Sequence, residues 1–240
     1  MRDVLIIPFN GVESLVIASD NSGGIGLKEM DEVQVPYETV AYYSFRVAVM
    51  ECMAARGKPF AVTVQNFSGE HAWNALMDGI NRGIEELGLE GFQINGSTES
   101  NFSLVQSATG LTVLGKVKTD AVGHSLKFSD ETVVAVIGKP LVGNEVVESE
   151  AEVAPISLFK QFCLLEDVFL LPVGSKGVLY EMNQLFVNRT FGETEIVADV
   201  DVKKSSGPST CFLAVFGREK KEEVMAAAGP YFHKVEVIKC

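Results

Sequence analysis

Apolar residues in the first half of the chain form several short runs and one long stretch that is apolar nearly all round. The short runs are typical of strands, because a buried strand needs only about four to eight residues. They cover residues 4–7, 15–18, 59–64, 92–94, 102–106 and 111–118. Residues 39–56 carry so few polar positions that we expect a helix that is buried on most sides.

A second helix is predicted where apolar residues recur at helical spacing over residues 73–87. Ser68 is its candidate N-cap, and Gly88 is expected to end it. His71 and Trp73 near its start are interpreted as helix residues rather than site residues, because large apolar side chains are most often core.

The second half of the chain continues the alternation of strands and helices. Its predicted strands cover 133–137, 168–171, 195–202, 211–216 and 235–238, and its predicted helices cover 178–186 and 218–228. This order indicates two α/β pieces with a boundary between Lys127 and Glu150. We therefore divide the chain into domains 1–130 and 131–240.

Composition narrows the class of protein. Of the 240 residues, 47% are apolar and 22% are charged, which is ordinary for a globular protein with a sizeable core. The formal net charge of -12 argues against a nucleic-acid partner, because such a surface needs clustered lysine and arginine. A nucleotide remains compatible with this charge, since it needs only a local group of N–H donors or a metal ion.

The cysteines and the longest apolar runs indicate where the protein works. The 4 cysteines are far apart and form no C-x-x-C pair, which argues against a zinc ribbon and favours a reducing compartment. The apolar run near the start is too short for a signal peptide, and no run approaches the length of a membrane span. We therefore expect a cytoplasmic protein that does not enter a membrane.

The first candidate for chemistry follows the run at 15–18. Ser19-Asp20-Asn21-Ser22-Gly23-Gly24-Ile25-Gly26 combines an acid, an amide and three closely spaced glycines. Glycines let backbone N–H groups approach a phosphate, and the Asp20 carboxylate is suited to the accompanying Mg²⁺. The alternative is a plain strand-to-loop turn, because Asn, Ser and Gly are the ordinary turn residues.

Two further acids are candidates for the same metal ion. Glu51 lies within the apolar helix, where a carboxylate without a cation at i+3 or i+4 spacing is costly. Glu99 follows a short strand in segment 95–101, whose small hydroxyls and amides are suited to phosphate. The alternatives are a solvated helix edge and an Asx or Ser/Thr turn. Asp20, Glu51 and Glu99 are therefore a candidate Mg²⁺ site drawn from separate elements.

A fourth candidate, Gly174-Ser175-Lys176-Gly177, lies between a predicted strand and a predicted helix. A helix N-terminus attracts anions, and Lys176 adds a point charge. The segment is not a Walker A loop, because the Gly-Lys-Ser/Thr sequence is missing. This difference argues against the P-loop class.

These motifs, in this order, resemble the PurM-like superfamily of aminoimidazole ribonucleotide synthetase, thiamine-monophosphate kinase and selenophosphate synthetase. The matching segments are VIASDNSGGIGLK, MECMAARGKPF and MDGINRGIEELGLEGFQINGSTESN, with weaker matches at VGSKGVLYEM and GPSTCFLAVFGREKKEEVMAA. The chain departs from the family's acids at Ser97, Asn21 and around Lys176. With these departures the short chain is most similar to the compact α-ribazole kinase (α-ribazole-phosphate synthase) branch.

The resemblance implies an α+β, two-domain PurM-like fold. Its N-terminal domain, 1–130, would bind ATP and Mg²⁺, and its mixed sheet with packed helices would form the interface of a homodimer. The C-terminal domain, 131–240, would be α+β. The implied activity is ATP-dependent phosphoryl transfer to a small, nucleoside-like hydroxyl compound, as in the salvage of the lower cobalamin ligand by α-ribazole kinase.

The resemblance also implies roles for individual residues. Mg²⁺ would be held by Asp20, Glu51 and Glu99, and Asp20 would be catalytic. Lys176 is assigned a catalytic role from its charge and position rather than from the resemblance. The residues expected to bind the nucleotide are Asn21, Gly23, Gly24, Gly26, Lys28, Gly96, Ser97 and Thr98, and those expected to bind the acceptor are Gly174 and Ser175. The alternative functions are an ATP-dependent synthetase of the same superfamily and a catalytically inactive nucleotide-binding or maturation protein.

Overall fold

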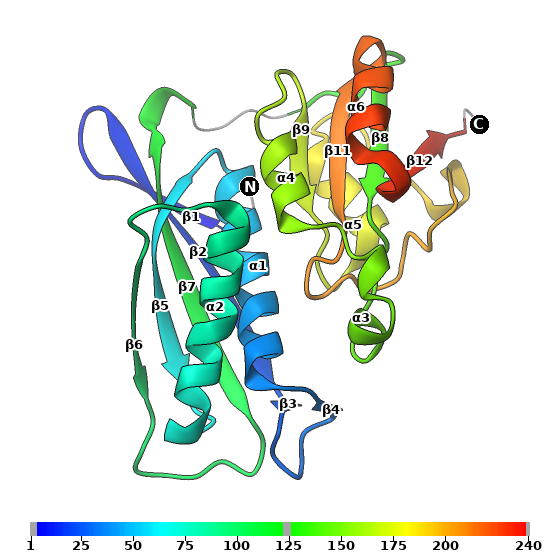
Figure 1. Cartoon of the computed structure of the whole chain (residues 1–240). Coiled ribbons are helices and arrows are strands. Elements are labelled where there is room, and N and C mark those ends of the chain that lie inside the picture. The colour runs from blue at the N-terminus through cyan, green and yellow to red at the C-terminus, as the bar shows by residue number, and fades with distance from the viewer. Residues whose placement is uncertain (1–3, 122–125, 239–240) are drawn as a thin grey trace. The chain divides into compact units, whose positions relative to one another are not determined.

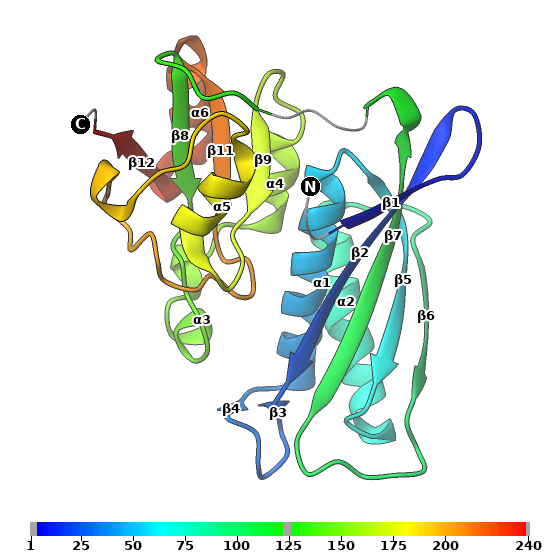
Figure 2. The same ribbon diagram turned by 180° about the vertical axis from the view of Figure 1, so that it is seen from behind.

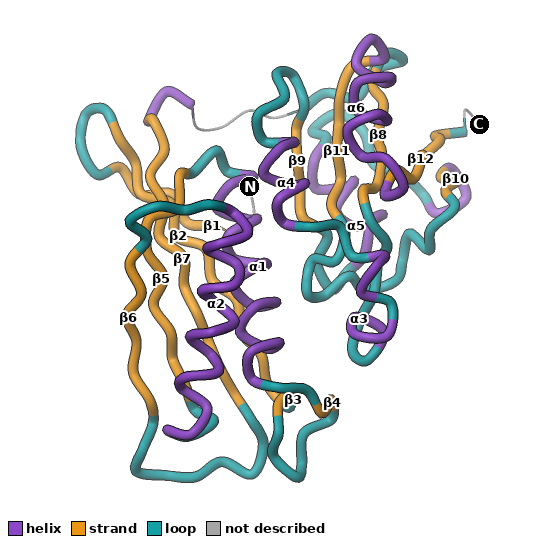
Figure 3. The backbone as a smooth tube through the Cα atoms, viewed as in Figure 1, coloured by secondary structure: helices purple, strands orange, loops and turns teal. Residues whose placement is uncertain are grey.

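The computed structural model describes residues 4–121 and 126–238 of the chain. The chain divides into two compact units, Met1–Val122 and Gly123–Cys240, and the described part of each contains a five-stranded sheet (Figure 1). Figure 3 shows that each unit also carries helices, which confirms the predicted α+β class. The domain boundary predicted at 130/131 lies a few residues after the boundary between these units.

The first unit carries the longer helices. Its elements are β1 (Val4–Pro8), β2 (Glu13–Gly23), β3 (Ile25–Gly26), β4 (Val33–Gln34), α1 (Tyr37–Ala54), β5 (Lys58–Asn66), α2 (Trp73–Leu87), β6 (Gln93–Thr98) and β7 (Ala108–Lys118). The sheet order is β1-β2-β7-β5-β6, and only the β5–β6 pair is parallel. Because α2 crosses over between these two parallel strands, both strands end at the same edge of the sheet.

One face of this sheet is covered by helices (Figures 1 and 2). Side chains alternate along β2, where Val16 and Ala18 are fully buried, and along β7, where Leu111 and Val113 are buried too. The helix α1 packs against both strands and against α2. The core of the first unit therefore lies between α1 and the middle of the sheet.

The two helices approach each other closely because glycines stand at their contact. A Cβ at position 79 would lie 2.1 Å from the carbonyl oxygen of Glu38, and one at position 83 would lie 2.5 Å from the Phe45 ring. Gly79 and Gly83 are one turn apart on α2, so they form a flat strip against α1. With α2 on one side and the sheet on the other, most of α1 is buried, as its apolar sequence predicts.

The substitution Gly79→Ala tests this contact. Alanine favours a helix over glycine by about 0.5–1 kcal/mol. The new methyl group would meet backbone atoms of α1, and such overpacking costs about 1–3 kcal/mol. We expect the clash to dominate, so that urea unfolding gives a lower free energy of unfolding. Gly11→Ala is the control, because a Cβ there meets no other atom within 4 Å. A stabilised Gly79→Ala variant would contradict the close helix contact.

In the described residues, no helix of this unit covers the opposite face of the sheet (Figure 2). Leu5 and Ile7 of β1 are 58% and 40% exposed there. They stand directly opposite Ile17 and Leu15 of β2, which are half-buried. This face is therefore apolar and open to a partner.

The second unit is built around a smaller antiparallel sheet. Its elements are β8 (Thr132–Ile137), α3 (Glu145–Glu148), α4 (Ile156–Phe162), β9 (Phe169–Pro172), α5 (Gly177–Leu185), β10 (Ile196–Ala198), β11 (Phe212–Gly217), α6 (Lys221–Ala228) and β12 (Phe232–Val237). The strand order is β10-β12-β8-β11-β9. Val178 and Met182 of α5 belong to one core cluster with Leu213 of β11. The Phe159 ring of α4 packs edge-on against Phe212, with 4.9 Å between ring centroids.

Some sequence predictions are wrong. Residues 102–106 form no strand, because β7 begins only at Ala108 and Phe102 and Val105 are left 78% and 76% exposed. Ser68 does not cap α2, since its hydroxyl contacts the backbone of Ala108 instead. The helix α4 was not predicted, and β10 is shorter than the predicted strand. Across the described ranges, no helix combines the length and the hydropathy needed to cross a membrane.

Candidate functional site

A pocket of about 400 Å³ opens at the edge of the first unit where β5 and β6 end. Its lining comes from the loop after β5, from the loop after β6 and from Lys28. Its charged or titratable side chains, among the described residues, are those of Lys28, Glu70, His71 and Glu99. The carboxyl ends of parallel strands form the edge at which open α/β sheets bind ligands. We therefore take this pocket as the candidate functional site.

Asn66, the last residue of β5, fixes the shape of the pocket. Its side-chain amide donates hydrogen bonds to the Gly69 carbonyl at 2.8 Å and to the Thr98 hydroxyl at 3.1 Å, and its carbonyl oxygen accepts the Ser68 N–H at 2.9 Å. Gly69 has a φ of 106°, which a residue with a Cβ rarely adopts. The loop after β5 is thus tied to the end of β6.

Lys28 is the cation of the pocket. Its Nζ donates hydrogen bonds to the Leu104 carbonyl at 2.9 Å and to the Phe67 carbonyl at 3.4 Å, so it joins the two loops that line the pocket. The residue is only half-buried. Because both acceptors are neutral carbonyls, an incoming anion would compete for Lys28 Nζ with two hydrogen bonds to uncharged groups. A lysine in this position is suited to a phosphate.

Asp31 holds the backbone of Lys28 in place. Its carboxylate accepts the Lys28 N–H at 2.9 Å, and the Ser107 N–H and hydroxyl, each at 2.6 Å. Burial favours the neutral form of Asp31, but these hydrogen bonds outweigh it and lower the pKa of the carboxyl below its usual value. The Ser107 hydroxyl also lies 3.0 Å from the Tyr37 hydroxyl. Lys28 is therefore placed by an ionised, buried carboxylate.

Glu99, Glu70 and His71 supply the other titratable groups. One Glu99 carboxylate oxygen accepts the N–H groups of Asn101 at 2.7 Å and Phe102 at 3.2 Å. The Glu99 side chain therefore closes a local turn with the backbone that follows it, and a turn was the alternative prediction for this segment. Glu70 and His71 lie in a short 3-10 turn that leads into α2, so the N-terminal end of that helical segment borders the pocket.

This arrangement can bind a phosphate together with a divalent cation. Lys28 and the helix N-terminus favour an anion. Carboxylate oxygens are the ligands that Mg²⁺ prefers, and Mg²⁺ is commonly held by one or two protein carboxylates plus phosphate oxygens. Glu70 and Glu99 meet that requirement in number and kind.

Asp20 is half-buried on the helix side of the sheet. It lies on β2 opposite Leu111 of β7, and it accepts hydrogen bonds from the Ser44 hydroxyl of α1 and from the Asn21 N–H. Burial raises the pKa of Asp20 to about 6, although the two hydrogen bonds act in the opposite direction. The Asp20 carboxyl is not part of the lining of the pocket at Lys28.

The three acids predicted to hold a metal ion do not gather into one group in the described part of the chain. The described residues contain no group of three or more His, Cys, Asp or Glu side chains that could hold a metal ion. Asp20 faces α1, Glu51 is half-buried on α1, and Glu99 lies in the loop after β6. Of these acids, Glu99 lines the pocket, and the metal role of each residue remains a prediction.

The predicted glycine loop is largely a strand. β2 continues to Gly23, because β7 is long enough to pair with Asp20, Asn21 and Gly23. Gly24 follows the strand, and its N–H donates to the Ser107 carbonyl at 2.8 Å. Gly26 lies in β3, where a Cβ would lie 2.4 Å from the Ser107 hydroxyl. The fold itself therefore uses part of this backbone, and nucleotide binding by these residues remains a prediction.

The predicted phosphate loop at 95–101 begins within a strand. Gly96, Ser97 and Thr98 lie in β6 and pair in register with Val64, Gln65 and Asn66 of β5. Asn95 accepts the Gly96 N–H through its side chain at 2.8 Å. Only the residues after Thr98 form a loop, so the edge of the pocket begins later in the sequence than predicted.

The segment at 174–177 joins β9 to α5, as predicted. Lys176 Nζ donates to the Tyr180 hydroxyl at 3.2 Å and lies 4.4 Å from the centroid of the same ring. Ser175 is exposed, and the Gly174 carbonyl accepts the N–H of Ser206 at 3.1 Å. Gly177, with a φ of 80°, packs against the backbone at 203–204.

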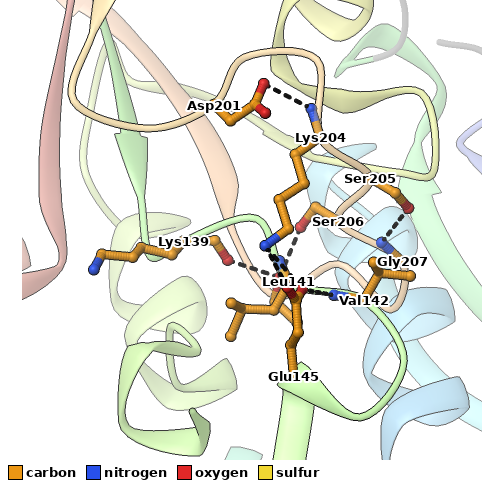
Figure 4. A network of polar contacts seen from close by, with 10 residues as sticks. Lys139, Leu141, Val142, Glu145, Asp201, Lys204, Ser205, Ser206 and Gly207 are labelled. Carbon is orange, nitrogen blue, oxygen red and sulfur yellow. Dashed lines mark hydrogen bonds and ion pairs between the residues drawn. The ribbon is translucent and has the colours of Figure 1, made fainter. Parts of the chain in front are cut away.

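The neighbouring loop at 203–207 was missed by the sequence analysis (Figure 4). Lys204 Nζ forms an ion pair with Glu145 at 2.8 Å, and Asp201 accepts the Lys204 N–H at 3.2 Å. The Gly207 N–H donates to the Ser205 hydroxyl at 3.3 Å. Two loops rich in glycine, serine and lysine thus lie side by side, and the order of residues alone gives no sign that they meet.

Glu70 and His71 are the site residues that sequence analysis missed. His71 was interpreted as a helix residue and Glu70 was not considered, and the structure places both just before α2 and in the pocket lining. Ser68-Gly69, between a predicted strand and a predicted helix, is the sequence feature that could have indicated them. A short loop of this kind directs the N-terminus of the following helix at a ligand.

The chain is similar in structure to two kinds of protein. The match to T. maritima PurL complexed with ATP has 14% sequence identity and a TM-score of 0.63, and it covers 98% of this chain and 42% of PurL. The match to hydrogenase maturation protein HypE has 11% identity and a TM-score of 0.63, and it covers 99% of this chain and 84% of HypE. A match in the HypE–HypF complex has 14% identity and a TM-score of 0.62, with 98% and 87% covered.

These likenesses define the class of fold. PurL and HypE are PurM-like proteins, so the predicted PurM-like fold is confirmed. The chain spans less than half the length of PurL. No family model and no curated protein matches the sequence. The α-ribazole kinase branch therefore remains a prediction.

Proposed function

We propose that this chain is an ATP-dependent enzyme that binds Mg²⁺-ATP in the pocket at the ends of β5 and β6. The observation that carries the proposal is the meeting of Lys28, Glu70, His71 and Glu99 in one pocket next to the start of α2. The PurM-like fold supports the proposal, because one of its structural neighbours, T. maritima PurL, is known in complex with ATP.

The basic and the acidic side chains of the pocket would bind different parts of Mg²⁺-ATP. Lys28 Nζ would turn from the two loop carbonyls to the phosphates, and the backbone N–H groups before α2 would add donors. Glu99 and Glu70 would hold Mg²⁺, which neutralises phosphate charge when bound. Lys28 already joins the loops after β5 and β6, so its movement would also change how these loops enclose the ligand.

The reaction we propose is phosphoryl transfer to a nucleoside-like hydroxyl, with α-ribazole as the candidate acceptor. Gly174 and Ser175 are proposed to bind the acceptor, and Lys176 to stabilise the transferred phosphoryl group. The exposed Ser175 and the Lys176 ammonium, whose acceptor is a neutral hydroxyl, support this role. Such transfer depends mainly on positioning and electrostatic stabilisation.

The chain's similarity to HypE favours a second candidate. The match covers 84% of HypE but 42% of PurL, so most of HypE has a structural counterpart in this chain. A nucleotide-binding maturation protein, with or without turnover, is therefore the second candidate function after the kinase. An ATP-dependent synthetase is the third possibility within the same fold.

The open sheet face supports the proposed homodimer. Leu5 and Ile7 are exposed on this face beside Leu15 and Ile17. An apolar sheet face that no helix of its own unit covers is stabilised by pairing with a second copy. Sedimentation velocity of the full chain measures this directly.

Thermal shift and product analysis test the proposed function. We expect ATP with Mg²⁺ to raise the melting temperature of the full chain, and a ligand at about 100 times its Kd adds about 2.7 kcal/mol. Incubation with α-ribazole should then yield ADP and a phosphorylated acceptor. A dehydrated, cyclised product would favour the synthetase, and stabilisation without turnover would favour the maturation protein. No shift at millimolar ATP and Mg²⁺ would contradict nucleotide binding.

A further inference from the structure

A second pocket, of about 380 Å³, lies in the second unit and takes no part in the proposed function. It is formed by the start of β8, the end of β12, the start of α6 and Arg189. Its volume is in the range of small-molecule sites. All of the described residues that line it belong to the second unit.

The register of the sheet separates this pocket from the loop at 174–177. Thr132, at the start of β8, pairs with Gly217, whereas Ile137, at the other end, pairs with Phe212. Phe212 also pairs with Pro172, which lies two residues before the loop at 174–177. The ends of β8 are about 17 Å apart at ordinary strand rise. The second pocket therefore lies at the opposite end of the sheet from the proposed acceptor loop.

The charge of the second pocket is opposite to that of the whole chain. The chain has 20 Lys and Arg against 32 Asp and Glu. Among the described residues that line the pocket, four are basic and two are acidic; the basic ones are Arg189, Arg218, Lys221 and Lys234. Because lysine and arginine are the minority charges of this chain, their gathering around one pocket favours an anionic ligand.

Three of these cations have partners that leave them able to bind an anion, whereas Arg189 is held by Glu195 at 3.1 Å. Glu236 is paired with Lys234 and also interacts with Lys221, so one carboxylate serves two ammonium groups. Arg218 is 3.4 Å from Glu131, and both side chains are mostly exposed. Exposed ion pairs of this kind are worth only about 0–1 kcal/mol, so a ligand anion can compete with the protein carboxylates.

The remaining lining is apolar and aromatic. Val133, Val235 and Val237 line the pocket from the two strands, together with Phe128. The Arg189 guanidinium lies 5.1 Å from the centroid of the Phe128 ring, which fixes a flat, cationic wall. Lys234 and Val235 are neighbours on β12 and therefore point to opposite faces of the sheet. A ligand that fits would place an apolar ring against Phe128 and Val237, and its anionic group would reach the lysines past the point where the pairing of β12 with β8 ends.

We propose that this pocket is a binding site for a small aromatic anion, whose phosphate or carboxylate group is held by Lys221 and Lys234. Arg189 and Phe128 would stack against its ring. The site binds without chemistry, and its existence does not depend on the function proposed for the first unit.

Calorimetric titration of the full chain with phenyl phosphate and with benzoate tests the proposal. We expect binding that weakens about tenfold or more in Lys221→Met and in Lys234→Met, as for the loss of a charged hydrogen bond. Glu236→Gln should bind more tightly than the parent chain, because it removes the competing carboxylate. The site is supported if either probe binds more weakly to the two lysine variants and more tightly to Glu236→Gln. The probe with the higher affinity identifies the preferred anionic group.

Two control variants show where the probe binds. Lys139→Met removes a lysine at the other end of β8, and Lys28→Met removes the cation of the pocket in the first unit. Lys139→Met should keep the affinity of the parent chain for phenyl phosphate, and Lys28→Met shows whether the probe binds in the first unit instead. The proposal is overturned if neither probe binds at millimolar concentration, if Lys221→Met and Lys234→Met bind as the parent does, or if only Lys28→Met loses binding.

Discussion

Lys28→Met is expected to abolish the thermal stabilisation that Mg²⁺-ATP gives and to lower turnover by about 10–100-fold, the effect of losing one charged hydrogen bond. Methionine keeps the apolar stem of the side chain but cannot donate to a phosphate. In the free protein it loses two hydrogen bonds to the carbonyls of Phe67 and Leu104, one of them long at 3.4 Å. We therefore expect a folded variant that is specifically deficient in nucleotide binding.

The control for Lys28→Met is Lys58→Met. Lys58 is an exposed lysine at the start of β5, and the pocket lies at the end of that same strand. Thermal shift with ATP and Mg²⁺, together with circular dichroism, separates loss of binding from loss of folding. Equal nucleotide stabilisation of Lys28→Met and the parent chain would rule out the pocket as the nucleotide site.

The fold could be predicted to a large extent because the apolar pattern is local. The stretch that is apolar all round became α1, and Gly88 ends α2 with a left-handed φ of 56°, as its position predicted. The pattern failed at 102–106, where the alternation of a strand is present but no neighbouring strand pairs with it. A sheet requires a partner, and periodicity carries no information about that partner.

The site was less predictable because it depends on which segments meet. Lys28 was expected to bind the nucleotide and Glu99 to bind the metal ion, and the pocket includes both. The expected glycine loop is instead strand up to Gly23, because its pairing with β7 extends further than its composition suggests. His71 reaches the pocket only because α2 begins two residues after it. Such meetings come from tertiary structure, which overrides the local preference of turn residues.

Asp20→Asn is expected to stabilise the protein at neutral pH. Burial raises the pKa of the Asp20 carboxyl from 3.8 to about 6, so its ionised form is disfavoured in the folded state. A shift of about 2 pKa units corresponds to at most about 3 kcal/mol. Asparagine carries no charge and has a similar shape, so it avoids this cost. In a chain of this size, each kcal/mol raises the melting temperature by about 2–4 °C.

The pH dependence identifies the cause. Between about pH 4 and pH 6 the folded state binds more protons at Asp20 than the unfolded state does. The free energy of unfolding of the parent chain therefore falls as pH rises through this window, and the loss is complete above pH 6. The advantage of Asp20→Asn should be largest at pH 8 and should shrink below pH 4. Asp120→Asn, at an exposed position, is the control.

Ligand binding then separates a structural role for Asp20 from a functional one. Functional sites often keep a charged group even though it lowers the stability of the fold. A carboxylate that is disfavoured at neutral pH, as Asp20 is, is therefore expected where function needs its charge. If Asp20 holds Mg²⁺, the stabilised Asp20→Asn variant loses the response to Mg²⁺-ATP and its turnover. A variant that is more stable at pH 8 and still turns over at the parent's rate would refute the predicted metal and catalytic roles. A difference in stability that does not change with pH would refute the burial of an ionised Asp20.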